Sequence, residues 1–464
     1  MTAAGTSTAV PSRNHIATPG VELLERLDER LPRYTSYPTA PHFTAEVGPD
    51  TYAAWLDALP ARLPVSLYLH VPFCEQLCHY CGCNTTVARA SDRIAHYAQL
   101  LMRELDLIGD AIGRRQAATH IHWGGGTPTA LAPDDFLAIT RKLRDTFALS
   151  ANAEIAVEID PRHLSRQHVA AFAKAGINRA SLGVQDLDPV VQQAIGRIQS
   201  FDQTSRAVDA LHEIGITSIS FDLMYGLPHQ TEESIARSLA TALTLKPSRV
   251  ALFGYAHVPW MKKHQELIQT DALPAGAERL AQVRAAEAEL AAAGYVAIGL
   301  DHFAHPADPL AVAYAMGHLH RNFQGYTTDA APALIGVGAS SIGSLPQGYV
   351  QNAPHLKAYR EAIERGRLAT ARGVALSNDD RIRRSIIERL MCDLKVDLAD
   401  FMDDPCKAFS GEIANLQTLA DEGAVAVEGT RIVIFPAMRP LVRKVASVFD
   451  HYLSKGTARY SRAV

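Results

Sequence analysis

The strongest constraint on the fold is a repeat of short apolar runs, each followed by a segment with helical spacing. The runs are Ser66–Val71, His120–Trp123, Glu154–Ile159, Arg179–Val184, Ser218–Met224 and Val250–Tyr255. The intervening segments, such as Asp92–Ile112 and Ala132–Phe147, repeat apolar residues every three or four positions, as amphipathic helices do. Consecutive βα units of this kind predict an α/β fold: a parallel sheet with right-handed crossovers, curled into a partial (βα)6 barrel.

Each predicted strand ends in residues of unusual chemistry. Cysteines follow the first run, Gly124–Thr127 the second, Glu158 and Asp160 close the third, Gln185 and Asp186 follow the fourth, Asp222 lies in the fifth, and Tyr255 and His257 close the sixth. Functional residues of βα barrels gather at the carboxyl ends of the strands. We therefore expect a single functional site along this rim.

The first strand is followed by the cluster Cys74-x3-Cys78-x2-Cys81-x-Cys83. Thiolates at this spacing can reach one inorganic centre across a tight loop. Zinc is an alternative, but structural zinc sites normally take further ligands from a second knuckle, and the other cysteines lie far along the chain with irregular spacing. A disulfide framework is also disfavoured, because six cysteines in 464 residues are too few for a disulfide scaffold.

Composition narrows the class of protein. The chain is 47% apolar and 20% charged with a net charge of −4, which is typical of a globular protein and argues against nucleic acid as the main partner. No apolar run reaches membrane-spanning length, and no secretory signal is apparent, so we expect a cytoplasmic protein without membrane contact. Residues 1–20 read as a disordered leader.

The cysteine spacing, with Tyr80 just before the third cysteine, resembles that of the radical S-adenosylmethionine (SAM) enzymes. The resemblance implies that Cys74, Cys78 and Cys81 hold a [4Fe-4S] cluster with one open iron, which chelates the amino and carboxylate groups of SAM. Such enzymes use an electron from the cluster to cleave SAM and obtain a radical. That radical removes hydrogen from a C–H bond that a side-chain base cannot attack.

Further motifs resemble one family within this group, the oxygen-independent coproporphyrinogen III oxidases. They are Pro32–Pro38, Tyr68–Cys74, the fourth cysteine Cys83, His122–Thr129, Gly183–Asp186, Asp222–Pro228 and His320–Thr328. The resemblance implies oxidative decarboxylation of two propionates of coproporphyrinogen III to vinyls in heme biosynthesis. It also implies two bound SAM molecules, a monomer, and an electron donor such as flavodoxin or ferredoxin. A related radical SAM heme chaperone is the alternative, although it typically lacks several of these motifs.

The same resemblance assigns residues to roles. It implies catalytic roles for Tyr68, Cys83, Glu158 and Asp222, and SAM contacts at Tyr68, Tyr80, Gly125, Gly126, Thr127, Glu158, Gln185, Arg197, Asp222, Ala256 and Ile342. Substrate candidates are Arg33, Arg321, Phe323 and Gln324, because a substrate with four propionates calls for cationic partners.

Alternatives stay open at several of these positions. Cys83 could be a fourth ligand or a thiol that binds no iron, and Tyr68 and Tyr80 could serve packing alone. Asp160, before Pro161, is expected to be structural. His120 and His122 alternate as a metal pair would, but a core role is the stronger expectation.

The pattern of predicted elements divides the chain into three parts. They are an extension at 21–64 that contacts the active site, the barrel with its additions at 65–374, and a small helical, winged-like domain at 375–464. Within the barrel's additions we expect a strand at Tyr295–Ala304 and a polar loop at His320–Thr328. The last domain should contain helices at Asp380–Leu394, Lys407–Glu422 and Met438–Leu453, with a hairpin at Ala424–Phe435. Winged domains often bind DNA, but the net negative charge of the chain favours a domain that covers the substrate.

Overall fold

The computed structural model describes residues 21–27, 29–88, 90–453 and 460, so the predicted leader lies outside the described residues. The six predicted strands are present as β1 (Val65–Val71), β4 (Ala117–Gly125), β5 (Ala148–Ile159), β6 (Arg179–Gln185), β7 (Ser218–Tyr225) and β8 (Arg249–Gly254). They pair in this order, and every pair is parallel. The predicted parallel sheet is confirmed.

The sheet continues beyond both ends of this parallel core. On one side β13 (Ala333–Val337) pairs parallel with β1, followed by the antiparallel strands β14 (Ile342–Leu345), β15 (Gly348–Asn352) and β16 (Thr370–Ala375). On the other side β10 (His302–Ala304) and β9 (Val296–Ile298) add antiparallel to β8. The 12-stranded sheet ends at β16 and β9, which do not pair with each other, so the barrel is open.

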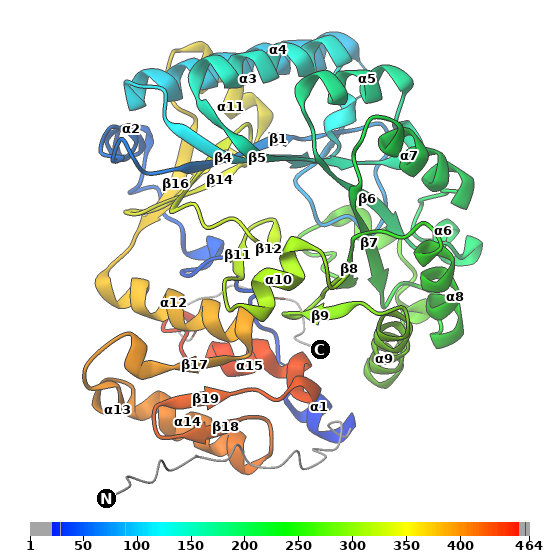
Figure 1. Cartoon of the computed structure of the whole chain (residues 1–464), viewed down its shortest axis with the longest axis vertical. Coiled ribbons are helices and arrows are strands. Elements are labelled where there is room, and N and C mark those ends of the chain that lie inside the picture. Colours follow the sequence, from blue (N-terminus) through cyan, green and yellow to red (C-terminus); the bar gives the residue numbers. More distant parts are fainter. Residues whose placement is uncertain (1–20, 28, 89, 454–459, 461–464) are drawn as a thin grey trace, which may run out of the picture.

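Helices cover the outer face of the curled sheet (Figure 1). The covering helices are α2 (Pro49–Asp57), α3 (Ser91–Ile112), α4 (Pro133–Thr146), α5 (Arg166–Ala175), α6 (Pro189–Ala194), α7 (Phe201–Glu213), α8 (Glu232–Leu243), α9 (Gly276–Ala292) and α11 (Leu356–Glu364). Their ends follow local signals: Ser165 caps α5 through the His168 amide, and Gly113 ends α3 in the left-handed conformation, as caps of these types do.

Two short segments differ from expectation. Tyr295–Ala304 is a hairpin of β9 and β10 rather than one strand, because the chain turns at Gly299, whose φ of +54° suits glycine. The polar segment at His320–Thr328 is a hairpin of β11 (His320–Asn322) and β12 (Gly325–Thr327) rather than a loop. Between these two hairpins lies α10 (Pro309–Ala315).

The C-terminal region has α12 (Asn378–Asp393) and the predicted wing-like hairpin of β18 (Ala426–Glu428) and β19 (Arg431–Val433), joined by β17 (Lys395–Asp397). The helix predicted at Lys407–Glu422 is two helices, α13 (Pro405–Ala408) and α14 (Ser410–Asp421). The long amphipathic helix predicted at Met438–Leu453 is wrong. A 3-10 turn at Pro436–Leu441, which contains Pro440, precedes the short α15 (Val442–Ser447), because proline cannot supply a helical N–H.

The C-terminal region packs against the start of the chain, where α1 (Val21–Leu27) also lies (Figure 1). Tyr34 and Tyr37 belong to the same buried apolar cluster as residues of α12, α14 and α15. The buried Arg443 guanidinium donates to the carbonyls of Leu31 and Pro32, and the Tyr34 hydroxyl donates to Asp450 over 3.1 Å. The two ends of the described chain thus form one packed unit.

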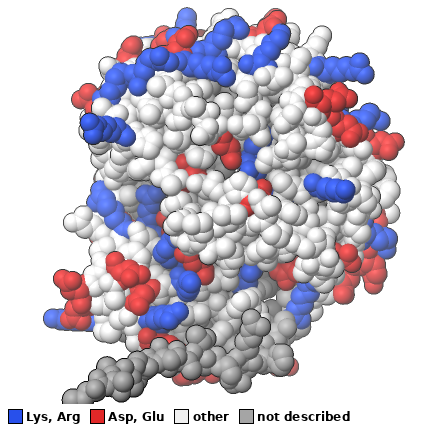
Figure 2. Space-filling view, in the orientation of Figure 1, with Lys and Arg blue, Asp and Glu red and all other residues white. Residues whose placement is uncertain are grey.

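In Figure 2, Lys and Arg side chains gather along the upper edge, where Figure 1 draws α3 and α4, and elsewhere on that face they alternate with Asp and Glu side chains. None of the helices in the described part of the chain combines the length and the apolarity needed to cross a bilayer.

A fully buried carboxylate joins α3 to β15, to α11 and to the turn after β13. Glu104 of α3 accepts hydrogen bonds from Asn352 Nδ2 over 2.6 Å, from the Tyr359 hydroxyl over 2.6 Å and from the Gly338 amide over 2.7 Å. Burial raises the pKa of Glu104 to about 7 despite these donors. The carboxylate fixes the turn between β13 and β14, which leads to Ile342.

We expect Glu104→Leu to lower the free energy of unfolding by at least about 3 kcal/mol, because each buried donor left without an acceptor costs about 1–3 kcal/mol. Urea unfolding of the metal-free protein, followed by circular dichroism, measures this loss. Asp110→Leu, at an exposed position of the same helix, is the matched control. A Glu104→Leu protein as stable as the control would contradict the role of this network.

Candidate active site

The cysteine loop lies at the carboxyl end of β1, where β2 (Phe73–Cys74) and β3 (Thr86–Val87) pair at its base. Cys74, Cys78 and Cys81 line a cavity of about 410 Å³, and all the cysteines of the chain are free thiols. Within the described residues, no three acidic, histidine or cysteine side chains converge closely enough to hold a single metal ion. Three free thiols spread around one cavity fit a multinuclear cluster.

Cys83 lies beside the third of these thiols. A hydrogen bond from the Cys83 thiol lowers the pKa of Cys81 to about 6, and the same bond raises the pKa of Cys83. Burial, with the neighbouring thiols of Cys81 and Cys78, raises the pKa of Cys74 to about 12. The arrangement makes Cys83 a donor toward Cys81.

Glycines at the end of β4 and directly after it let the backbone approach the cysteine loop. A Cβ on Gly126 would lie 2.8 Å from Cys74 Sγ, and one on Gly125, whose φ is +119°, would lie 2.8 Å from the Val71 carbonyl. A Cβ on Gly124 would lie 2.7 Å from a carboxylate oxygen of Glu158. Side chains at these positions would therefore fill the space between the cysteine loop and Glu158.

Glu158 is held at the rim by its neighbours on β4. His122 Nε2 lies 2.8 Å from Glu158 Oε1, and the Gly125 amide donates to Oε2 over 3.3 Å. The Tyr68 ring stacks on His122 with ring centres 5.9 Å apart, and its hydroxyl lies 3.0 Å from His70 Nδ1. Tyr68 therefore reaches Glu158 through His122, a histidine that was expected to serve the core.

Asp222 of β7 is a second carboxyl group in the lining of the cavity. It accepts a hydrogen bond from the Ser181 hydroxyl over 3.1 Å. Burial, together with the charge of Glu158, raises the pKa of Asp222 to about 7. This carboxyl group can therefore donate or accept a proton near neutral pH.

Two arginines meet next to Cys78. Arg162 and Arg197 both pair with Asp160, at 2.7 and 3.2 Å. Although burial acts in the opposite direction, the hydrogen bond from Arg162 and the charge of Arg197 hold the pKa of Asp160 at about 2. This geometry agrees with the structural role expected for Asp160. Arg162 was not identified from the sequence, since an arginine after a strand end looks like a surface charge.

The loop after β8 also contacts the cysteine loop. Lys262 Nζ donates to the Cys83 carbonyl over 2.8 Å, and Gln265 Nε2 donates to the Tyr80 carbonyl over 2.9 Å. His264 Nε2 lies 2.7 Å from the Cys81 carbonyl. These contacts span about 180 positions of sequence, and no local pattern could have revealed them.

The cavity brings together most of the predicted SAM contacts. Its lining includes Tyr80, Gly125, Gly126, Glu158, Gln185, Arg197, Asp222 and Ala256, with Arg33 from the substrate candidates. Tyr68, Thr127 and Ile342 are not in this lining. Thr127 instead bonds the Thr129 hydroxyl over 2.8 Å, and Ile342 packs against Tyr349 and Phe43.

A second cavity of about 510 Å³ shares the wall of Arg33, Gly254, Tyr255 and Ala256 with the first. Four arginines line it, namely Arg30, Arg33, Arg279 and Arg443, against two acids, Glu287 and Asp301. Arg279 lies 5.4 Å from the Tyr225 ring centre, and Arg30 lies 5.1 Å from that of Trp260. The second cavity is cationic and aromatic.

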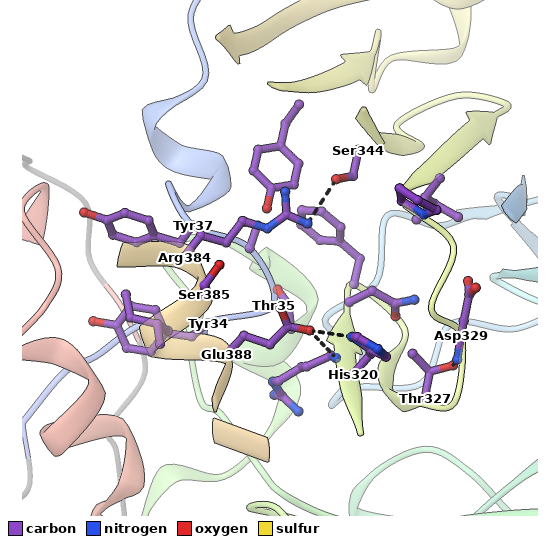
Figure 3. Close-up of a pocket in the computed structure, with 18 of the residues that line it drawn as sticks. Tyr34, Thr35, Tyr37, His320, Thr327, Asp329, Ser344, Arg384, Ser385 and Glu388 are labelled. Atoms are coloured by element: carbon purple, nitrogen blue, oxygen red, sulfur yellow. Dashed lines mark hydrogen bonds and ion pairs between the residues drawn. The ribbon is translucent and has the colours of Figure 1, made fainter. Parts of the chain in front are cut away.

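The remaining substrate candidates lie elsewhere. Arg321 and Phe323 line a cavity of about 350 Å³ between the β11–β12 hairpin and α12, shown in Figure 3. There His320 Nδ1 lies 3.1 Å from Glu388, and Arg384 donates to Ser344 over 3.5 Å. Gln324 lines an inner cavity that shares Cys83, Glu158 and Asp222 with the cysteine-lined cavity. Arg321 still reaches the active site indirectly, because its guanidinium donates to the Arg33 carbonyl over 3.2 Å.

Comparison with known proteins agrees with this geometry. The Radical SAM superfamily model matches residues 68–242. The oxygen-independent coproporphyrinogen III oxidase of Bradyrhizobium diazoefficiens is 51% identical over 94% of this chain and 98% of its own length. That of Pseudomonas aeruginosa is 38% identical over 96% and 98%.

A solved structure is similar as a whole. Coproporphyrinogen III oxidase from Escherichia coli, described as a radical SAM enzyme, superposes with a TM-score of 0.87 at 36% identity and covers 92% of this chain and 100% of its own. The similarity thus includes the regions before and after the barrel. The chain belongs to the oxygen-independent coproporphyrinogen III oxidases, a family of the radical SAM superfamily.

Proposed function

We propose that this protein converts two propionate side chains of coproporphyrinogen III to vinyl groups, giving protoporphyrinogen IX in heme biosynthesis. Each conversion removes one hydrogen atom from the β-carbon, releases CO2 and passes one electron to an acceptor. A [4Fe-4S] cluster on Cys74, Cys78 and Cys81, with bound SAM, supplies the hydrogen-abstracting radical. The protein's own residues bind the substrate, orient it and exclude water.

The observation that carries this proposal is the shared wall of the two cavities. The cysteine-lined cavity meets a cavity with four arginines at Arg33, Gly254, Tyr255 and Ala256. Guanidinium groups bind carboxylates through paired hydrogen bonds, and aromatic rings suit the apolar part of a macrocycle. A substrate with four propionates would fit such a cavity while one of its side chains points toward the cysteine loop.

We propose individual roles that are consistent with the geometry. Arg33 is the proposed first partner of a substrate propionate, because it lines both cavities. Glu158, oriented by His122, is proposed to bind SAM at the rim, and Asp222 is proposed to hold a SAM group deeper in the barrel. Cys83 is proposed as a catalytic thiol that binds no iron, in accord with its hydrogen bond to Cys81.

We also propose a cytoplasmic monomer that receives electrons from a carrier such as flavodoxin or ferredoxin. Its six free thiols suit a reducing compartment. The heme chaperone alternative is less well supported, because the similar proteins described above are oxidases by name.

The decisive experiment is anaerobic reconstitution with iron and sulfide, followed by dithionite, SAM and coproporphyrinogen III. Formation of protoporphyrinogen IX with about two CO2 per substrate, the number that the proposed reaction requires, supports the oxidase. Tight heme binding without turnover would instead support the chaperone.

We predict that Cys74→Ser, Cys78→Ser and Cys81→Ser each abolish the brown chromophore of the cluster, because three thiolates are the smallest number of ligands that can hold it. Cys83→Ser should retain iron and sulfide and lose turnover. Ultraviolet–visible spectra and iron analysis measure the first effect, and Cys406→Ser, at an exposed thiol, is the control. If Cys83→Ser also fails to hold the cluster, Cys83 is a ligand and no open iron remains.

Arg33→Ala should lower kcat/KM for coproporphyrinogen III by roughly 10- to 100-fold, because a hydrogen bond to a charged group contributes about 1.5–3 kcal/mol. Cluster content should stay unchanged. Steady-state turnover with dithionite as reductant measures the effect. Arg141→Ala, at an exposed position of α4, should behave as the unmodified protein, and equal values for both variants would exclude Arg33 from substrate binding.

Two SAM molecules should bind per cluster, because the proposed contacts at Gln185, which ends β6, and Ala256, which follows β8, come from another part of the rim than those at Gly125 and Glu158. Gln185→Ala should lower the stoichiometry toward one SAM while the SAM-induced change in the cluster's EPR spectrum persists. Equilibrium dialysis with radiolabelled SAM measures the ratio. Gln193→Ala, on the exposed side of α6, is the control. One SAM per cluster in the unmodified protein refutes the second site.

A further inference from the structure

Two guanidinium groups converge on the sulfur of one proposed cluster ligand. Arg162 Nη2 and Arg197 Nη1 each donate to Cys78 Sγ over 3.6 Å. Both donors come from the rim of the barrel, Arg162 from the turn after β5 and Arg197 from the segment after α6. Cys78, one of the three proposed ligands, therefore lies beside two positive charges.

Asp160 holds both arginines in place. Arg162 donates to it through Nε over 3.0 Å and through Nη2 over 2.7 Å, and Arg197 donates through Nη2 over 3.2 Å. The Arg162 and Arg197 side chains are each 7% exposed and that of Asp160 is 13% exposed. The forked geometry fixes the guanidinium planes. Because water is largely excluded, the charges act on the sulfur with little screening.

The arrangement leaves a net positive charge beside Cys78, since two cations surround one carboxylate. In iron–sulfur proteins, net charge and hydrogen bonds to the cysteine sulfurs set the reduction potential of the cluster. Groups that hold a ligand also tune the metal. A reduced cluster carries one more negative charge than an oxidised one, so a cationic donor stabilises the reduced form.

We propose that Arg162 is a positioning residue for Cys78 that raises the reduction potential of the bound cluster. The inference rests on the cluster named in the proposed function. Arg197 shares the contact but is also a proposed SAM contact, whereas Arg162 has no proposed role in binding SAM or substrate. A substitution at Arg162 therefore tests the effect of its charge on the cluster separately from the binding of SAM or substrate. A higher reduction potential also makes it easier for the cluster to accept the electron that is then used to cleave SAM.

The test is an EPR-monitored potentiometric titration of the reconstituted protein without SAM or substrate. Arg162→Gln should hold the same iron and sulfide as the unmodified protein, with its midpoint potential shifted to a more negative value. Arg162→Lys, which retains the charge and loses the fork, should shift less. Arg166→Gln, at an exposed position four residues further on, should leave the midpoint unchanged.

An Arg162→Gln protein whose midpoint equals that of Arg166→Gln would overturn the inference. If Arg162→Gln fails to hold iron, the comparison of Arg162→Met with Arg166→Met decides in its place, because methionine also removes the charge and keeps a long side chain, and an equal midpoint again overturns the inference. A failure of the proposed function looks different, because the unmodified protein would then show no cluster signal or no turnover. The titration needs only the cluster, so the two outcomes stay separate.

Discussion

The active site depends on the parallel direction of six neighbouring strands. Because β1 and β4 to β8 all run the same way, their carboxyl ends meet at one rim. The register then places Tyr68 opposite His122, Glu158 opposite Ser181 and Gly183 opposite Asp222. Side chains far apart in sequence thereby become neighbours, and the cysteine loop joins them at the end of β1.

Charge balance within the rim follows from burial. An isolated buried charge is costly, so it needs a partner. Glu158 has His122, and Asp160 has two arginines whose remaining N–H groups point to Cys78. The Arg443 guanidinium donates to the Leu31 and Pro32 carbonyls, and burial together with the charge of nearby Arg33 lowers the pKa of Arg443 to about 10. The arginine-lined cavity is therefore a place where an added carboxylate relieves repulsion.

Much of this could be predicted from the sequence because the signals are local. The apolar runs predicted the strands, and the residues at the ends of these runs predicted the rim at which the functional side chains gather. The helix predicted at Met438–Leu453 was wrong because apolar periodicity cannot distinguish a surface helix from a buried turn with Pro440 inside it. The contacts of Arg162, His264 and Gln265 with the cysteine loop were missed, since they depend on how distant loops fold together. Arg321 and Phe323 were expected near the substrate because of their motif and the charge of Arg321, and they line a different cavity.

The contact of Arg443 with the carbonyls of Leu31 and Pro32 also sets the order in which parts of the structure can form during synthesis. Arg33 directly follows Leu31 and Pro32, whose carbonyls are held by Arg443. The ribosome releases the cysteine loop and all six parallel strands, which end at Gly254, before it releases Arg443. The carbonyls of Leu31 and Pro32 therefore meet Arg443 only when the last part of the chain has been made. A chain that terminates before Arg443 lacks this anchor for the segment that carries Arg33.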